Sequence, residues 1–381
     1  MKVFTIAGIL MAAMLANCIN VSVAVAATRK TTAQTAIERV TNQWQEDKDL
    51  IGLSASCVSG TQTISAASGQ ADASRDTRLD ADYRFQIGSI TKTFTAAAIM
   101  TLVADGQIDL EDTLAGWYPD FPNADAVTLR ALLDMTAGTF DFFRASPENP
   151  MIPLIMEDIR RPWTPDEVIA VAANQSPQGE PGTLFRYSNT NYFLLGRIVE
   201  KVSGMKLGVF FEDRLLASAG LSKTRLFRTD ETAFLFASGY LRDSAFLFGH
   251  DAPFSLEQGD YAGLETLGWA AGGMTATSAD LARWGQALFT GQIVDEPQLK
   301  DMITPTALAN EGDQRYGLGV ETFDTEVGTA YGHAGSLPGY AAILMFFPDQ
   351  QASIAVTTND EAGEQFLQSV AIDIAQNACA E

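Results

Sequence analysis

The segment from Phe85 to Ala104, FQIGSITKTFTAAAIMTLVA, constrains the fold more than any other, because its only charge is that of Lys92. From Ser89 onward, apolar side chains recur on one helical stripe and also on the opposite side. The pattern predicts a helix that is apolar nearly all round, and such a helix is buried. A buried ammonium is costly unless it is paired, and burial lowers its pKa. We therefore expect a core built around a helix that contains a lysine.

Ser89 lies three residues before Lys92, so both side chains share one helical face. Ser89 also follows Gly88 at the expected helix start, where free N–H groups and the helix dipole favour negative charge. This arrangement is a nucleophile beside a base. The alternative is that Ser89 is an ordinary N-cap. The bare S-x-x-K spacing is unspecific, since Ser203–Lys206 also matches, but the glycine inside that second match is typical of a helix stop.

Two further segments carry polar groups suited to a cleft. In Pro181–Asn189, the side chains of Tyr187 and Asn189 are two residues apart on a turn, where a phenol can carry protons and an amide can hold substrate. Each also has a plain structural interpretation, as a packed aromatic and a helix cap. In Tyr331–Ser336, YGHAGS, the glycines allow a substrate backbone to lie against a strand edge. His333 taken alone is typical of a surface histidine.

Strand pairs near both chain ends predict the fold class. Each pair is flanked by a helix, and together they predict one antiparallel sheet assembled from both ends. The expected strands are 51–58, 61–68, 339–347 and 352–358, and the expected helices are 31–44 and 361–378. The middle of the chain, about 114–264, has helical periodicity with proline and glycine breaks. The prediction is an α+β fold, with a sheet part at about 27–113 and 265–381 and an inserted, mainly helical subdomain.

The N-terminus resembles a targeting segment. Lys2 precedes the apolar run Val3–Leu15, and Ala24–Ala26 offers small residues for cleavage. We expect residues 1–26 to be a signal peptide and the mature protein, 27–381, to be periplasmic or secreted. A lipid anchor at Cys18 is the alternative, and only in that case is a membrane a partner. Export permits a disulfide between Cys57 and Cys379, but two unpaired cysteines fit the sequence equally well.

Composition limits the partners. The net charge of −22 would repel nucleic acid, so no nucleic-acid partner is expected. With two histidines and three cysteines, the chain has neither C-x-x-C nor H-E-x-x-H spacing, so no metal site is expected. No cofactor is expected, and the oligomeric state is left open.

Taken in order, the motifs resemble those of the penicillin-recognising serine hydrolases. Ser89–Lys92 matches the S-x-x-K element, Tyr187–Asn189 the Y-x-N element and His333–Gly335 the H-x-G variant of K-T-G. Leu132–Gly138, LLDMTAG, is similar to the family segment L-L-x-H-T-S-G, with Met135 and an alanine as departures. The resemblance covers about residues 35–378 and implies a β-lactamase/transpeptidase-like fold. It also implies an exported serine hydrolase that acts through an acyl-enzyme.

The resemblance implies a role for each motif residue. Ser89 would attack a carbonyl after losing its proton to Lys92, or to Tyr187 with Lys92 lowering the pKa of that phenol. The oxyanion would lie between the backbone N–H groups of Ser89 and Ser336. Asn189 would orient the acyl amide. His333 would help to position a substrate carboxylate, beside the strand edge opened by the glycine of H-x-G, Gly335.

The chain contains no K-T-G sequence, and this narrows the class of substrate that we expect. The H-x-G form resembles that of D-alanyl-D-alanine carboxypeptidases and D-peptidases, so we expect a small peptide of the peptidoglycan type. A class C-like β-lactamase acting on β-lactams, and an esterase of the same fold, are the alternatives. The non-enzymatic alternative is an inactive scaffold that binds peptidoglycan fragments. Covalent labelling by a fluorescent penicillin or a fluorophosphonate separates this scaffold from an enzyme.

Overall fold

A computed structural model describes residues 32–144, 149–227, 235–242, 254–256, 266–309 and 315–379. The expected signal peptide, the lipidation candidate Cys18 and His250 lie outside these residues. Within the described ranges, no helix combines the length and apolar character needed to cross a membrane.

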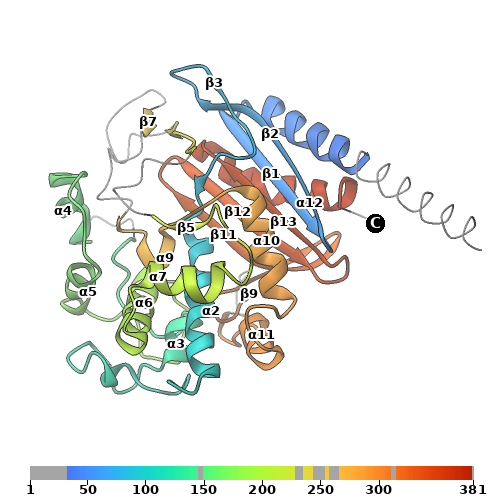
Figure 1. Cartoon of the computed structure of the whole chain (residues 1–381). Coiled ribbons are helices and arrows are strands. Elements are labelled where there is room, and N and C mark those ends of the chain that lie inside the picture. Colours follow the sequence, from blue (N-terminus) through green and yellow to red (C-terminus); the bar gives the residue numbers. More distant parts are fainter. Residues whose placement is uncertain are drawn as a thin grey trace, which may run out of the picture.

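The central element is an eight-stranded antiparallel sheet built from both ends of the chain (Figure 1). The strand order is β3-β2-β1-β13-β12-β11-β10-β9, and β1 pairs with β13 to join the two ends. The strands are β1 Gly52–Ser59, β2 Gln62–Asp72, β3 Thr77–Arg78, β9 Arg315–Tyr316, β10 Glu321–Thr325, β11 Gly328–Leu337, β12 Tyr340–Phe347 and β13 Ala352–Thr358. The predicted α+β class and the sheet assembled from both chain ends are confirmed.

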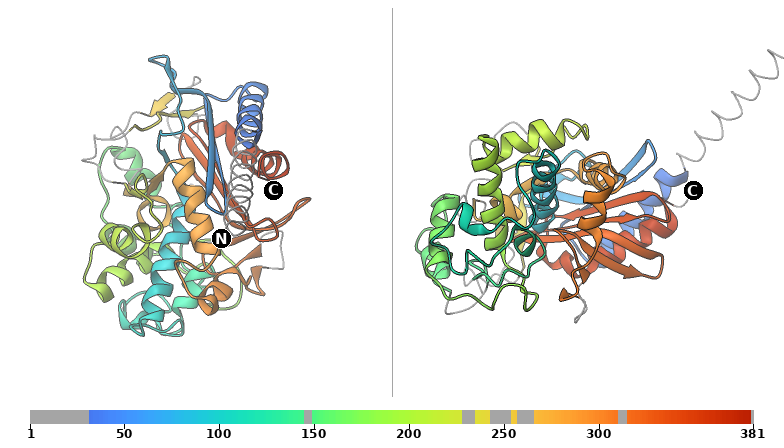
Figure 2. Two further views of the ribbon diagram at one scale, coloured as in Figure 1. Left: turned by 45° about the vertical axis from the view of Figure 1, so that its right-hand side comes forward. Right: turned by 90° about the horizontal axis from the view of Figure 1, so that it is seen from below.

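Helices cover both faces of this sheet, which explains why β12 is apolar at every position. The helix at residues 32–47 and α12 (Leu367–Asn377) lie on one face, and α10 (Ser278–Phe289) lies on the other (Figure 2, left). Alternate side chains of a strand point to opposite faces. Ile343 and Met345 accordingly pack with the terminal helices, whereas Leu344 and Phe346 pack into the core that contains α10.

The middle of the chain supplies most of the remaining helices. They are η2 Leu114–Gly116, α3 Leu129–Leu133, α4 Met151–Glu157, α5 Pro165–Ala173, α6 Asn189–Ser203, α7 Leu207–Phe211 and the π-turn η3 Glu212–Leu216. The short strands β5 Arg225–Leu226, β6 Gly239–Leu241 and β7 Phe254–Leu256 follow, then α9 Trp269–Gly272, β8 Met274–Ala276 and α11 Glu296–Ile303. As expected of a helix stop, Gly204 ends α6 in the left-handed conformation, with φ of 71°.

Helix α2, Thr91–Ala104, runs through the core between the sheet and the helical part. It is preceded by β4 (Phe85–Gln86) and by one 3₁₀ turn, η1 (Gly88–Ile90). Every α2 residue from Thr91 to Met100 is buried, and the Phe94 ring stacks on Trp284 of α10 with centroids 3.9 Å apart. The apolar segment therefore forms the buried helix that its pattern predicts.

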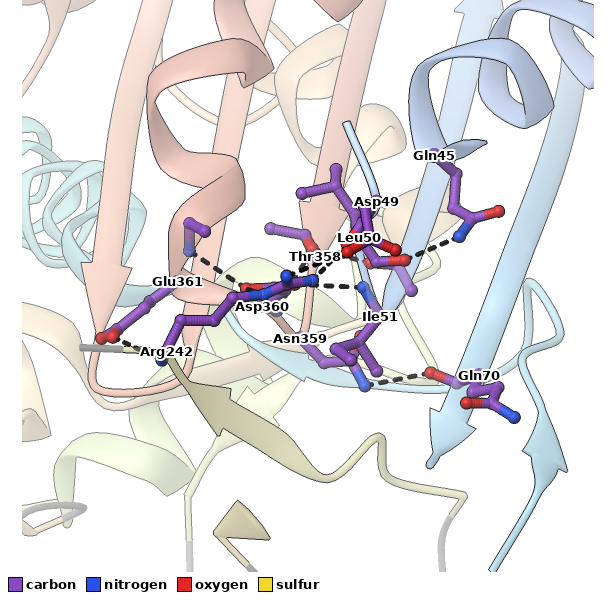
Figure 3. Close-up of polar contacts among 12 residues, drawn as sticks. Gln45, Asp49, Leu50, Ile51, Gln70, Arg242, Thr358, Asn359, Asp360 and Glu361 are labelled. Carbon is purple, nitrogen blue, oxygen red and sulfur yellow. Dashed lines mark hydrogen bonds and ion pairs between the residues drawn. The ribbon is translucent and has the colours of Figure 1, made fainter. Parts of the chain in front are cut away.

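A buried carboxylate joins the middle of the chain to the sheet (Figure 3). Asp360, directly after β13 and before η6 (Glu361–Phe366), accepts hydrogen bonds from the Ile51 N–H at 3.1 Å and from Arg242 Nη2 at 2.6 Å. The neighbouring Asn359 side chain donates to the Ser238 carbonyl at 2.8 Å. These contacts hold the β6 segment against the end of β13.

Cys57 on β1 and Cys379, just after α12, form a disulfide with Cα atoms 6.3 Å apart. The sequence left this pairing open. The bond closes a loop that spans 322 positions, so it restricts the unfolded chain strongly.

We expect Cys379→Ser to lower the free energy of unfolding by about 2–4 kcal/mol, because the open chain regains that loop entropy. Urea denaturation of the oxidised protein and of the variant measures the difference. Reduced wild-type protein should match the variant. Equal midpoints for the oxidised wild type and the variant would contradict this expectation.

Candidate active site

Ser89 is presented by a tight turn that touches strand β11. Gly88 has φ of +51°, in the left-handed region, and a Cβ on it would lie 2.5 Å from the Ser336 backbone nitrogen. A Cβ on Gly335 would lie 2.1 Å from the Ile87 carbonyl oxygen. Both glycines are therefore required for turn and strand to approach this closely. The contact brings the backbone N–H of Ser336 beside the turn that carries Ser89.

Lys92 is fully buried, and three oxygen atoms surround its side-chain nitrogen. Nζ lies 2.9 Å from Ser89 Oγ, 2.9 Å from Asn189 Oδ1 and 2.7 Å from the Ala271 carbonyl oxygen. These acceptors come from η1, α6 and α9. The three donors of an ammonium group each have a partner, so burial of this charge is compensated.

Burial lowers the pKa of Lys92 from 10.5 to about 7, although the carboxylates of Asp141 and Glu321 act to raise it. Desolvation disfavours the charged form of a lysine. Near neutral pH a substantial fraction of Lys92 is thus an uncharged amine, 2.9 Å from a serine hydroxyl. An amine in this state can accept the serine proton.

Asp141 orients Asn189 and was not identified from the sequence. Its Oδ1 accepts hydrogen bonds from the Asn189 backbone N–H at 3.0 Å and from Nδ2 at 3.2 Å, which turns the Asn189 oxygen toward Lys92. Burial raises the pKa of the Asp141 carboxyl. The sequence indicates only that a buried Lys92 needs a carboxylate nearby, and it does not indicate which one.

Tyr187 lies beside both catalytic candidates. Lys92 Nζ is 4.8 Å from the centroid of the Tyr187 ring. Burial raises the pKa of the Tyr187 phenol well above 10, although a hydrogen bond with the Ser89 side chain acts to lower it. The phenol is thus protonated near neutral pH. Of the two proposed proton acceptors, Lys92 has the pKa that suits a base at pH 7.

His333 is 1% exposed, so its interpretation as a surface histidine is wrong. It lies within β11 itself. Nδ1 is 2.5 Å from the Ala334 carbonyl oxygen, which can only accept, so Nδ1 carries a proton. Nε2 is 3.1 Å from the hydroxyl of Tyr316. Burial lowers the pKa of His333, and the imidazole is neutral at pH 7.

An open cleft of about 500 Å³ lies over these groups. Its lining includes five of the residues selected from the sequence, namely Ser89, Tyr187, His333, Gly335 and Ser336. Lys92 contacts Ser89 of this set, and Asn189 in turn contacts Lys92. The lining also includes Tyr316 and Glu321, which were not among the site residues selected from the sequence.

The second S-x-x-K match lies elsewhere. Ser203 is the last residue of α6, and its hydroxyl donates to the Val199 carbonyl within the same helix. Among the described residues, no group of three or more histidine, cysteine, aspartate or glutamate side chains is placed to hold a metal ion.

Comparison with known proteins places this geometry in a family. The family model described as Beta-lactamase matches residues 15–378. Penicillin-binding protein 4* of Bacillus subtilis (strain 168) is 27% identical over 308 residues, which cover 79% of this chain and 66% of that protein. D-aminopeptidase of Brucella anthropi is 23% identical over 319 residues, which cover 82% of this chain and 56% of that protein. The chain thus spans between about half and two thirds of the length of these curated relatives.

A comparison with a solved structure covers a larger share of both chains than the sequence matches do. The D-amino acid amidase from Ochrobactrum anthropi SV3, complexed with L-phenylalanine amide, superposes with a TM-score of 0.77 at 26% identity. The match covers 91% of this chain and 98% of that one. The resemblance drawn from the S-x-x-K, Y-x-N and H-x-G elements is confirmed, and the protein belongs to the beta-lactamase family.

Proposed function

We propose that this protein is a serine hydrolase that cleaves its substrate through an acyl-enzyme on Ser89. The observation that carries the proposal is the 2.9 Å contact between Ser89 Oγ and the buried Lys92 Nζ, with the Lys92 pKa lowered to about 7. By contrast, a lysine exposed on a protein surface is charged at this pH and cannot act as a base.

In the first step, Ser89 Oγ attacks the substrate carbonyl and its proton passes to neutral Lys92. The carbonyl π bond opens as the new C–O bond forms, and the oxygen becomes negative. When the bond to the leaving group breaks, that group takes up a proton, delivered from Lys92 through Tyr187. Water then attacks the acyl carbon and gives a proton to Lys92, which is neutral again. The bond from that carbon to Ser89 Oγ breaks, Oγ takes the proton back from Lys92, and the acid product leaves. Asn189 and the Ala271 carbonyl hold Lys92 in place throughout.

The oxyanion in this scheme is held by the backbone N–H groups of Ser89 and Ser336. The support is the glycine-mediated contact between the turn and β11, where the positions of Gly88 and Gly335 leave no room for a Cβ. Backbone donors fixed in this way need no reorganisation when charge develops on the carbonyl oxygen.

For the substrate, we propose an amide bond in a small peptide or amide of a D-amino acid. The relatives named D-aminopeptidase and D-amino acid amidase support this class. A D-alanyl-D-alanine carboxypeptidase needs a positive group for the terminal carboxylate. His333, which was expected to meet that carboxylate, is a neutral imidazole, and Nη1 of Arg315 at the cleft is engaged by Asp324 at 2.8 and 2.9 Å. We therefore favour the D-peptidase or amidase form over the carboxypeptidase, and also over a β-lactamase or an esterase.

We also propose that the protein acts outside the cytoplasm, as a periplasmic or secreted enzyme. The support is the signal-like pattern of residues 1–26 together with the Cys57–Cys379 disulfide, since disulfides persist in oxidising compartments. A lipid anchor at Cys18 remains the alternative route of export. Mass spectrometry of the mature N-terminus tests both, because cleavage after Ala26 removes Cys18.

Ser89→Ala should abolish covalent labelling by a fluorophosphonate, because it removes the side-chain oxygen that forms the acyl-enzyme in this scheme. Ser203→Ala is the matched control and should label like wild type, since its hydroxyl is engaged within α6. Gel fluorescence after labelling measures both variants. Labelling retained in Ser89→Ala would exclude Ser89 as nucleophile, and a wild-type protein that never labels would favour the inactive scaffold.

Lys92→Met should slow acylation by about 10²- to 10⁴-fold, the usual contribution of a general base. Its effect on stability should be small. Methionine removes the cost of burying an amine, and this offsets the loss of hydrogen bonds to Asn189 and Ala271. Labelling rates and thermal melting measure the two effects. A large fall in melting temperature would instead give Lys92 a chiefly structural role.

Acylation should depend on pH through Lys92. Because burial lowers its pKa to about 7, the neutral base is lost as pH falls below 7. The labelling rate should therefore rise about tenfold per pH unit at low pH and level off above about pH 8. Stopped labelling between pH 5 and 9 gives the profile. An inflection near pH 10, or none at all, would argue against Lys92 as the base.

A further inference from the structure

Asp141 lies in the loop after α3, against the turn that carries Tyr187 and Asn189. Asp141 Oδ1 accepts the Asn189 backbone N–H at 3.0 Å, and beside this contact the Thr139 hydroxyl donates to Ser188 Oγ at 2.9 Å. Asp141 is 7% exposed. The loop therefore holds a buried carboxylate directly against the turn that carries two residues of the site.

The donors around Asp141 favour its charged form. Oδ1 accepts hydrogen bonds from the Asn189 backbone N–H at 3.0 Å, from Asn189 Nδ2 at 3.2 Å and from the Phe143 N–H at 3.2 Å. Burial raises the pKa of the Asp141 carboxyl, whereas these hydrogen bonds and the charge of Lys92 act to lower it. Hydrogen bonds to a charged group stabilise that form. Asp141 is thus a compensated carboxylate with Lys92 as its electrostatic partner.

Asp141 determines which end of the Asn189 amide faces Lys92. A side-chain amide has one oxygen that accepts and one NH₂ group that donates. Nδ2 donates to Asp141, and Oδ1 accepts from Lys92 Nζ at 2.9 Å. A flipped amide would place its oxygen against the carboxylate and its NH₂ group against the lysine donors, so both contacts would be lost. Carboxylate, amide and amine therefore form one chain of hydrogen bonds with a single direction.

This chain becomes stronger when Lys92 is charged. Once Lys92 has accepted the Ser89 proton, its ammonium group is a stronger donor to Asn189 Oδ1, and the amide is polarised toward Asp141. The carboxylate also attracts the new positive charge through space. No proton moves to Asn189 or to Asp141. The aspartate of a Ser-His-Asp triad acts in a comparable way, since it orients the base and stabilises its cation without taking the proton.

We propose that Asp141 is a positioning residue for the reaction at Ser89. Through the Asn189 amide it directs the Lys92 side chain, and its charge stabilises the ammonium group that forms when Lys92 takes the serine proton. This inference rests on the proposed function, and it adds a third member to the pair of nucleophile and base.

The other groups near Lys92 decide what loss of the Asp141 charge does. Among the described residues, further titratable groups face Lys92 from neighbouring segments, namely Glu321, Tyr187, Tyr192 and His333. The phenols and the imidazole are uncharged near pH 7, because burial raises the pKa of each tyrosine and lowers that of the histidine. The carboxylates of Asp141 and Glu321 act to raise the pKa of Lys92 against the effect of burial. Loss of one of them should therefore lower this pKa further.

Asp141→Asn tests the proposal, because it removes the charge and nearly preserves the shape. The rate of fluorophosphonate labelling is measured on the full chain between pH 5 and 9. Because the pKa of Lys92 falls, the midpoint of the profile should move to lower pH by about 1 unit. The plateau rate should fall at least about tenfold, because the amide is no longer directed and the ammonium is less stabilised. A merely structural role would lower the stability without moving the midpoint.

Asp134→Asn is the matched control. Asp134 is a buried carboxylate at the end of α3, and it accepts hydrogen bonds from the Thr136 N–H at 3.1 Å and from its hydroxyl at 2.6 Å. The variant changes the net charge equally and should keep the midpoint of the wild type. Circular dichroism checks that both variants are folded. An unchanged midpoint in Asp141→Asn, or equal shifts in the two variants, would overturn the proposal.

A double variant shows whether Asp141 acts through Asn189. If it does, Asp141→Asn should slow the plateau rate of Asn189→Ala less than about twofold, although it slows the wild type at least about tenfold. Losses that multiply in the double variant would overturn this route.

Failure of the proposed function has a different signature, namely a wild type that neither labels nor hydrolyses a D-amino acid amide. NMR titration of protein with isotope-labelled lysine side chains then decides the role of Asp141, because it reads the pKa of Lys92 without any reaction. Lys92→Met identifies the signal. We expect a lower Lys92 pKa in Asp141→Asn and none in Asp134→Asn. An unchanged Lys92 pKa in both variants would overturn the inference.

Discussion

The whole site depends on one buried amine. Lys92 can be uncharged near pH 7 because α2 is enclosed by the core, and it can be tolerated there because three oxygens from separate segments surround it. Those oxygens belong to Ser89, Asn189 and Ala271. The hydrogen bonds that compensate the burial of Lys92 therefore join η1, α6 and α9. The same packing that forms the junction also buries Lys92, and this burial is what lowers its pKa to about 7.

The second constraint on the site is the close backbone contact between η1 and β11. The cleft lies where η1 meets β11. Gly88 and Gly335 have no Cβ atom, and this allows the two backbones to approach each other. One edge of β11 then places the N–H of Ser336 beside the turn that carries Ser89, and the N–H of Ala334 on Glu321.

Much of this arrangement could be predicted before the fold was known. The apolar surroundings of Lys92 indicated a buried helix, and the spacing to Ser89 indicated a shared face; both describe local structure. Asp141 was missed, because its contact with Asn189 joins residues 48 positions apart and leaves no local pattern. His333 was expected to meet a carboxylate. Burial lowers its pKa, and this burial and the contact with Tyr316 become visible only when β9 and β11 are placed in one sheet.

The sequence by itself determined most of the helices and strands and the pairing of Ser89 with Lys92. Hydrophobic periodicity specifies which segments are strands and helices, and S-x-x-K spacing on a helix places serine beside lysine whatever the fold around them. Only the tertiary structure decided the charge of the cleft. How Arg315 is engaged, whether His333 is charged and whether Glu321 lines the cleft all depend on neighbours brought together by the sheet. Electrostatic free energies vary with burial and with distance in space, and neither quantity can be obtained from the order of residues along the chain.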